Sequence, residues 1–211
     1  MRIALINENS QAAKNELIYN TLDNVAKKFG HVVDNYGMLN SEDKPLTYVQ
    51  NGLLAAILIN SGAADFVVTG CGTGEGAMLA LNSFPHVLCG HIVDPADAFM
   101  FGQINDGNAI ALPFAKGFGW GAEVNLEYIF ERLFQTPFGG GYPKERVVPE
   151  QRNKKILDSV KEITHTPMTE IIKKIDRDFL LETIDRDTFK KYFFENAKDQ
   201  EIISLIKEIL A

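Results

Sequence analysis

The segment that decides the fold is DFVVTGCGTGEGA, which occupies residues 65–77. Its first half is apolar and β-branched, which is typical of a strand buried on both faces of a parallel sheet. Three glycines within residues 72–76 predict a tight turn whose backbone can approach a ligand closely. A helix is predicted after Gly76, and the unpaired N–H groups at such a helix start bind phosphate, carboxylate or enolate oxygens. The segment therefore predicts a strand, an anion-binding turn and a helix in succession.

Strands and helices alternate in both directions from this segment. The predicted strands, the central one included, are Ile3–Asn7, His31–Tyr36, Asp65–Gly70, His86–Val93 and Asn108–Leu112. The predicted helices are residues 10–29, residues 46–61, a stretch after Gly76, a stretch after Pro95, and residues 122–134. This alternation predicts an α/β fold, in which right-handed crossovers build a five-stranded parallel sheet with helices on both faces.

The 211-residue chain changes character near residue 150. All 17 glycines lie before that point, and the 12 acidic and 12 basic residues of positions 151–211 leave the whole net charge of −7 to the first part. Residues 1–150 are therefore predicted to form the α/β domain. Residues 151–211 carry apolar side chains at helical spacing and are predicted to form an all-helical extension. Its apolar faces predict packing on the sandwich or on a dimer seam, and its aromatic cluster is Phe189, Tyr192, Phe193 and Phe194.

The tetrapeptide Ile-Asp-Arg-Asp occurs twice in the extension, at residues 175–178 and 184–187. Aspartate is a favoured residue at helix N-caps, so the last aspartate of each copy, Asp178 and Asp187, is predicted to cap a helix. Two copies do not indicate a repeat architecture.

Composition argues against several classes of protein. A net charge of −7 disfavours a broad surface for nucleic acid or anionic membranes. The longest apolar run, Leu53–Ile59, is far shorter than the ~20 residues of a membrane-spanning helix. Two cysteines, Cys71 and Cys89, are too few for a disulfide scaffold or a cysteine-only zinc site, and no metal site is predicted. Because Glu8 comes too early for a secretory signal, a cytoplasmic protein with free thiols is expected.

Cys71 is the residue that this pattern favours as a catalytic base. It lies where the central strand meets the glycine turn, and the backbone N–H groups and helix dipole there favour a thiolate. An ordinary cysteine has a pKa of about 8.5, so modest stabilisation makes it a usable base near neutral pH. The alternative for Cys71 is a small buried core residue, which is what we expect for Cys89. Glu75, inside the turn, is a weaker candidate because its carboxylate would repel a developing oxyanion.

A second interpretation of the turn is dinucleotide binding. Residues 72–77 fit G-x-G-x-x-A, and Asp94 follows the next predicted strand, as the acidic residue of that fingerprint does. However, two strand–helix units precede the turn, whereas the fingerprint usually lies in the first. The remaining chain also leaves little room for a second nucleotide-binding half, so a nicotinamide cofactor is the less favoured reading.

The motifs resemble the type B ribose-5-phosphate isomerase and galactose-6-phosphate isomerase family over residues 1–150. The resemblance rests on Cys71-Gly72-Thr73-Gly74-x-Gly76, Asn82, Gln103-x-Asn105-Asp106-x-Asn108, Gly140-Gly141 and Arg146-Val147, which occur in the family's order. It extends to Glu8-Asn9 with Lys14 and to Asp43-x-Pro45 near the start of the chain. Residues 151–211 exceed the ordinary family length.

The resemblance implies a Rossmann-like three-layer α/β/α sandwich that forms a homodimer or a dimer of dimers with shared active sites. It also implies isomerisation of an aldose phosphate to a ketose phosphate through a cis-enediolate, without metal or other cofactor. Cys71 would move the proton with help from Thr73, and the amides of Gly72, Gly74 and Gly76 would hold the enediolate oxygens. The implied substrate contacts are Glu8 and Asn9 at the mouth, Asn105 on the sugar hydroxyls and Arg146 on the phosphate.

Departures from the family pattern bear on the substrate. The family's Asp-His pair is Glu8-Asn9 here, and Ala115 replaces an expected arginine, with Lys116 or Lys144 as possible substitutes. The family's ring-opening histidine is Ile104, which cannot transfer a proton.

Either another histidine opens the ring, for which His91 is the best placed, or no ring has to be opened. The second option predicts an open-chain or short substrate such as a tetrose phosphate. A non-catalytic sugar-phosphate-binding partner subunit of a hetero-oligomeric isomerase is the alternative from another class.

Overall fold

The computed structural model describes all residues from Met1 to Ala211 and contains one five-stranded parallel sheet. The sheet has the strand order β2-β1-β3-β5-β4. The strands are β1 (Arg2–Ile6), β2 (Val32–Asn35), β3 (Phe66–Cys71), β4 (Cys89–His91) and β5 (Ala109–Pro113). The prediction of a parallel sheet with this number of strands is confirmed.

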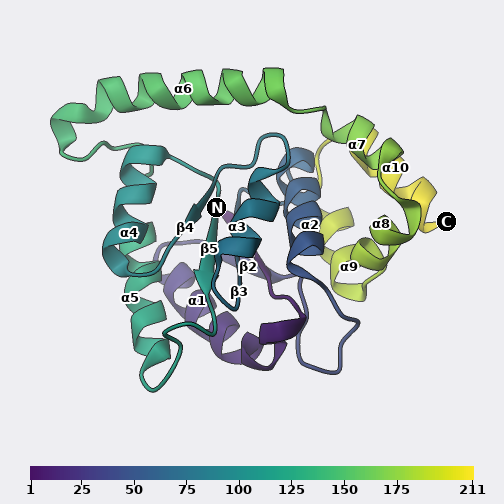
Figure 1. Cartoon of the computed structure of the whole chain (residues 1–211), viewed down its shortest axis with the longest axis horizontal. Coiled ribbons are helices and arrows are strands. Elements are labelled where there is room, and N and C mark those ends of the chain that lie inside the picture. The colour runs from purple at the N-terminus through teal and green to yellow at the C-terminus, as the bar shows by residue number, and fades with distance from the viewer.

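Helices cover both faces of the sheet, so the fold is the expected Rossmann-like α/β/α sandwich (Figure 1). One face carries α1 (Asn15–Lys28), α4 (Pro95–Met100) and α5 (Ala122–Phe134), which pack on one another. The other face carries α2 (Tyr48–Ser61) and α3 (Glu75–Asn82). Three short turns of helix complete this part: η1 (Asn9–Lys14), the π-helical η2 (Phe101–Asn105) and η3 (Lys144–Arg146).

Local signals account for the ends of α2. Thr47 and Gln50 form a capping box at its start, and Gly62 ends it in the left-handed conformation, with φ of 69°. Residues 50–58 of α2 are all buried, because the helix is covered by the sheet on one side and by the C-terminal helices on the other.

Strand β4 is shorter than the predicted His86–Val93. The side chain of Asn108 accounts for this, because its Nδ2 donates to the carbonyl oxygen of His86 at 2.7 Å and its Oδ1 accepts from Leu88 N at 2.8 Å. His86 also has a positive φ of 58°, so the chain turns at this residue, and the regular register with β5 begins only at Cys89.

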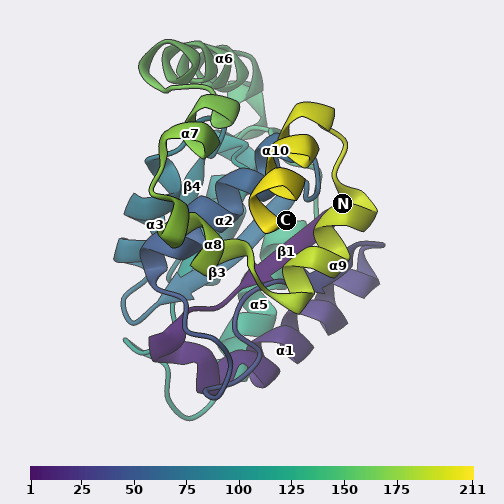
Figure 2. The ribbon, with the colours of Figure 1, turned by 90° about the vertical axis from the view of Figure 1, so that its right-hand side faces the viewer.

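The C-terminal region is helical, as predicted. It contains α6 (Val147–Thr164), α7 (Met168–Lys174), α8 (Arg177–Ile184), α9 (Asp187–Asn196) and α10 (Gln200–Leu210). Helices α7 to α10 lie over α2, as the turned view in Figure 2 shows, whereas α6 forms the upper edge of the molecule in Figure 1. Helix α6 runs through residue 150 without a break.

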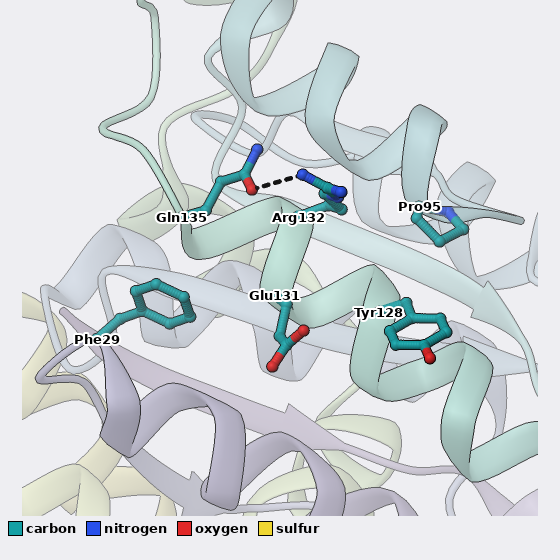
Figure 3. Close-up of a pocket in the computed structure, with 6 residues that line it drawn as sticks. All are labelled: Phe29, Pro95, Tyr128, Glu131, Arg132 and Gln135. Carbon is teal, nitrogen blue, oxygen red and sulfur yellow. Dashed lines mark hydrogen bonds between the residues drawn. The ribbon is translucent and has the colours of Figure 1, made fainter.

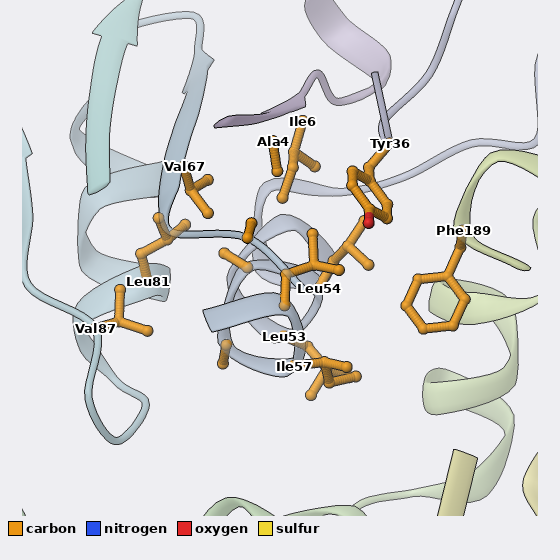
Figure 4. Packing of buried hydrophobic residues seen from close by; sticks show 14 of the residues in the cluster. Ala4, Ile6, Tyr36, Leu53, Leu54, Ile57, Val67, Leu81, Val87 and Phe189 are labelled. Carbon is orange, nitrogen blue, oxygen red and sulfur yellow. The ribbon is translucent and has the colours of Figure 1, made fainter. Parts of the chain in front are cut away.

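Residues of the extension and of the sandwich share one hydrophobic core. Phe189 and Phe193 of α9 are fully buried in the cluster that also holds Leu54 and Ile57 of α2 (Figure 4). The ring of Phe189 meets that of Tyr36 edge-on, with 6.4 Å between centroids. The aromatic cluster therefore packs on the sandwich.

No helix of the chain combines the length and the apolar character needed to cross a membrane.

The predicted caps in the two Ile-Asp-Arg-Asp segments are wrong. The cap of α8 is Asp176, whose Oδ1 accepts from Phe179 N at 2.8 Å, and Asp178 lies in the first turn. Helix α9 has Arg186 at its N-cap position and no side-chain cap, so Asp187 also lies in a first turn.

Candidate active site

The carboxyl ends of β1 and β3 form the crevice where a ligand is expected in this fold. The two strands are neighbours in the sheet, and the helices that follow them cover opposite faces. In open α/β sheets, ligands bind in the crevice outside the strand ends at the point where consecutive connections go to opposite faces of the sheet. Residues Asn7–Asn9 follow β1 and residues 72–76 follow β3, so both segments lie at this crevice.

Cys71 is the last residue of β3 and points its sulfur into the turn that follows. The Sγ accepts the backbone N–H of Gly74 at 3.2 Å, and 8% of the residue is exposed. This hydrogen bond holds the sulfur at the turn that leads into α3. Gly74 can make this contact because its φ of 82° is left-handed, and a Cβ there would lie 2.8 Å from the ring of His91.

The turn leaves several backbone amides without acceptors. The N–H groups of Gly72, Thr73, Gly76 and Ala77 make no hydrogen bond within the chain, while those of Gly74 and Glu75 bind Cys71 Sγ and Thr73 Oγ1. Free amides at the start of α3, next to the sulfur, suit an anionic oxygen. One turn therefore brings together the sulfur and the backbone amides that the sequence analysis singled out.

His91 and Thr73 are both part of this turn's framework. His91 Nε2 lies 2.8 Å from the carbonyl oxygen of Thr73, so the imidazole donates to the backbone of the turn. Thr73 is exposed, and its hydroxyl accepts Glu75 N at 3.3 Å. In this chain His91 thus supports the turn, and this hydrogen bond occupies its Nε2.

Glu8 and Asn9 leave β1 in different environments. Glu8 is 3% exposed, and its carboxylate caps η1 by accepting Ser10 N at 2.8 Å. The expected open carboxylate of Glu8 at the mouth of the site is therefore not present. Asn9 is exposed and lines a cavity of about 660 Å³ with Thr47 and Gln50 of the sandwich.

The segment after β5 is bound to the glycine turn through its backbone. Phe114 N donates to the carbonyl oxygen of Cys71 at 2.9 Å, and Lys116 N donates to that of Gly72 at 2.9 Å. The Lys116 side chain is exposed and lines a small cavity between β5 and α5, so only its backbone is placed at the turn. Asp94, the acid of the dinucleotide reading, caps α4 by accepting Asp97 N at 2.9 Å.

Asn105 and Arg146 lie at the other end of the sheet. The register pairs Cys71 with Pro113 at the carboxyl end of β5, while Asn105 precedes the amino end of that strand. The strand alone separates the two by about 13 Å. Arg146 is exposed at the start of α6, which packs on η2 beside Asn105. One chain therefore does not bring these two residues to its own Cys71.

Two side chains near the turn were not singled out as site residues. Lys14 donates its Nζ to Gln11 Oε1 at 2.8 Å and to the carbonyl oxygen of Phe114, and it has no carboxylate partner. Tyr48 is exposed, and its Cδ2 lies 3.3 Å from where a Cβ on Gly76 would be. Lys14 and Tyr48 are far in sequence from the residues that they contact, so no local pattern predicts these contacts. Only the order of the strands in the sheet brings the segments together.

A second cavity, of about 510 Å³, lies along α5, with the end of α1 and the start of α4 beside it, and holds none of the candidate residues (Figure 3). It is bounded by Phe29, Tyr128 and Glu131, and the hydrogen bond between Arg132 Nη1 and Gln135 Oε1 measures 3.0 Å. No cluster of three or more His, Cys, Asp or Glu side chains is arranged to hold a metal ion.

Residues 3–149 match the sequence model of the Ribose/Galactose Isomerase family, and residues 163–209 match a family described as Ribose-5-phosphate isomerase. These matches define the class of protein as an isomerase. The chain belongs to the Ribose/Galactose Isomerase family, which confirms the resemblance inferred from the sequence. A search of the curated proteins found no significant match.

Solved structures of isomerases are similar to this chain. A 4-deoxy-L-threo-5-hexosulose-uronate ketol-isomerase complexed with a tartrate is 61% identical over 100% of this chain and 99% of its own, with a TM-score of 0.98. A ribose-5-phosphate isomerase from Vibrio parahaemolyticus is 47% identical over 99% of both chains, with a TM-score of 0.97. The type B ribose 5-phosphate isomerase from Trypanosoma cruzi is 25% identical over 77% of this chain and 99% of its own, with a TM-score of 0.60.

Proposed function

We propose that this protein is a ketol isomerase that uses Cys71 to move a proton between two adjacent carbons of an open-chain sugar. The Cys71 thiolate removes the proton from C2 of the aldose, and the electron pair forms the C1–C2 double bond of a cis-enediolate. The resulting thiol returns the proton to C1, which yields the ketose. The observation that carries this proposal is the Cys71 sulfur beside four backbone amides that have no acceptor.

The amides and Thr73 complete the proton transfer. Negative charge develops on the C1 and C2 oxygens as the enediolate forms, and free N–H groups held in place by the turn stabilise it most where the charge is largest. The hydroxyl of Thr73, exposed beside these amides, is placed to assist the proton exchange between the two oxygens.

The substrate that best fits the site is a sugar acid with no ring to open. Ile104 supplies no proton for ring opening, and the imidazole of His91 is bound to the Thr73 carbonyl. A 4-deoxy-5-hexosulose uronate, the substrate class in the name of the 61% identical relative, has no hydroxyl on C4 and a ketone at C5. It therefore lacks the hydroxyls that would close a furanose or pyranose ring onto C1.

A phosphorylated sugar is the second candidate, which the 47% identical ribose-5-phosphate isomerase supports. A tetrose phosphate would satisfy the same chemical requirement, because its terminal hydroxyl carries the phosphate and cannot close a furanose. The ammonium group of Lys14 contacts Phe114, whose N–H binds the Cys71 carbonyl oxygen, and a single cation suits a carboxylate at least as well as a phosphate.

Turnover of three compounds tests this assignment. We expect 4-deoxy-L-threo-5-hexosulose uronate to give the highest kcat/KM, erythrulose 4-phosphate to be turned over measurably, and ribose 5-phosphate to be at least about 100-fold slower, because general-acid help in ring opening is missing. Isomerisation followed by NMR gives all three rates. Preferred turnover of ribose 5-phosphate would contradict the open-chain assignment. Thermal stabilisation by these compounds without any turnover would indicate the non-catalytic binding subunit.

We also propose that a second subunit completes each site, because Asn105 and Arg146 lie away from Cys71 within the chain. In a two-fold symmetric dimer, a surface at the far end of one sheet can reach the crevice of the other. The partner subunit's Arg146 and Asn105 would then bind the acid group and the hydroxyls of the substrate.

Mixed dimers test the shared site. Cys71→Ala and Arg146→Ala variants should each be nearly inactive alone, whereas co-expression should restore about a quarter of the wild-type activity, because half of the dimers are hybrids with one intact site. Each variant mixed with wild type serves as the control. An absence of restoration in verified hybrid dimers would place both residues in one subunit's site or in none.

A further inference from the structure

The two Ile-Asp-Arg-Asp segments of the extension place their arginines in opposite environments. Arg177, in the first copy, is exposed at the start of α8 and forms no ion pair. Arg186, in the second copy, has a side chain that is only 3% exposed. Burying a guanidinium is costly unless it is well paired, so the contacts of Arg186 require an explanation that those of Arg177 do not.

Arg186 binds the middle of the loop formed by residues 37–46, which connects β2 to the start of α2. Its Nη1 donates to the carbonyl oxygen of Lys44 at 2.8 Å, and its Nη2 lies 3.3 Å from Asp43 Oδ2. A second connection runs the other way, since Lys44 Nζ donates to the Asp185 carbonyl oxygen at 2.9 Å and to its Oδ2 at 3.0 Å. The extension thus binds one short piece of this loop from both sides.

Both ends of the loop 37–46 are attached to the crevice. Met38 N donates to the carbonyl oxygen of Asn7 at 3.0 Å, and Asn9 N donates to that of Leu46 at 2.8 Å. Two residues beyond Leu46, the ring of Tyr48 lies against Gly76 in the catalytic turn. A displacement of residues 43–44 would therefore move the backbone that supports Asn9 and the side chain that flanks the free amides.

The extension also forms part of the cavity that Asn9 lines. Leu181, Glu182 and Asp185 of the α8 region line it together with Thr47 and Gln50. The segment that Arg186 holds contributes Lys44 and Pro45 to the same cavity.

The contacts of Arg186 are poor as a source of stability. Its Nε and Nη2 have no hydrogen-bond acceptor although both are buried, and burial lowers the pKa of the guanidinium. Replacing a buried, incompletely paired charge by an apolar side chain of similar size is often neutral or stabilising. What an apolar side chain cannot do is bind the Lys44 carbonyl group and hold the loop in place.

We propose that Arg186 is a positioning residue of the active site: it holds the loop 37–46 so that Asn9 and Tyr48 keep their places beside the turn of Cys71. This inference rests on the proposed isomerase function. The helical extension then contributes to catalysis by holding the loop in place. It does not touch the reacting atoms.

Three variants of the full-length chain test the proposal: Arg186→Met, Arg186→Lys and, as the matched control from the other tetrapeptide, Arg177→Met. We expect Arg186→Met to lower kcat/KM at least about tenfold, since small misplacements of binding groups are costly. Its melting temperature should stay within about 3 °C of wild type. Arg186→Lys should recover part of the activity, and Arg177→Met should match wild type.

Amide hydrogen exchange supplies a readout that does not depend on the substrate. In Arg186→Met the N–H groups of Asn9 and Met38 should exchange faster than in Arg177→Met, while those of β3 are unchanged. Equal kcat/KM in the two methionine variants, or unchanged exchange at Asn9, would overturn the proposal. A loss of activity matched by a large fall in melting temperature would show a structural role only. If wild type isomerises none of the compounds, the proposed function fails, and the exchange result alone decides the positioning role.

Discussion

Cys71→Ala is expected to reduce kcat/KM by about two to four orders of magnitude while the protein stays folded, because the variant lacks the group that accepts the C2 proton. The loss should fall on kcat, since the free amides of Gly72 and Gly76, which we propose to bind the substrate oxygens, remain in place. The measurement is the isomerisation rate together with the melting temperature, compared with wild type under the same conditions.

Cys89→Ala is the matched control. Both cysteines are 8% exposed, so exposure does not distinguish them, but their surroundings do. Cys71 Sγ accepts an N–H group at the crevice, whereas Cys89 lies in β4 and burial raises the pKa of its thiol, which keeps it neutral. We expect Cys89→Ala to retain wild-type kcat. If Cys71→Ala keeps more than about a tenth of the wild-type kcat/KM, the base lies elsewhere, and Glu75 would be the next residue to replace.

Phe189→Ala is expected to lower the free energy of unfolding by about 3–5 kcal/mol, as removal of a fully buried aromatic ring leaves a cavity. The ring stacks on Phe193 with 4.7 Å between centroids. It also meets Tyr36 of the sandwich edge-on (Figure 4). Since domains are stable by only about 5–15 kcal/mol, this is a large share of the total. Urea unfolding followed by circular dichroism measures it.

Phe194→Ala provides the comparison within the same helix. Phe194 is a partly exposed aromatic residue beside Phe193, so its removal should cost well below half as much. If both variants unfold like wild type, the extension contributes little to the stability of the sandwich. A separate early transition in Phe189→Ala would instead show that α7 to α10 detach before the sheet unfolds.

Local patterns made much of the sandwich predictable. Buried β-branched runs and amphipathic helices give the order of the elements, and a right-handed crossover leaves few ways to connect them. The prediction failed where side chains from distant segments intervene. Asn108 converts the start of the predicted fourth strand into a turn, and no periodicity within residues 86–93 reveals it.

The two copies of Ile-Asp-Arg-Asp show the same limit. Identical tetrapeptides carry no information about their neighbours, so the sequence predicted the same capping role for both. In the structure Asp176 caps α8, whereas Asp185 pairs with Lys44 and Lys190 and Arg186 is buried against the loop 37–46. Packing of the extension on the sandwich creates this difference.

By itself, the sequence determined that a cysteine, a bare-backbone turn and a helix start stand together, because all three lie within a few consecutive residues whose geometry is local. The family followed from the same residues. Only the tertiary structure decided that His91 supports the turn, that Glu8 caps a helix, and that Asn105 and Arg146 lie at the opposite end of the sheet. These relations depend on which strands are neighbours and on what the extension covers, and such long-range packing is a property of the whole chain.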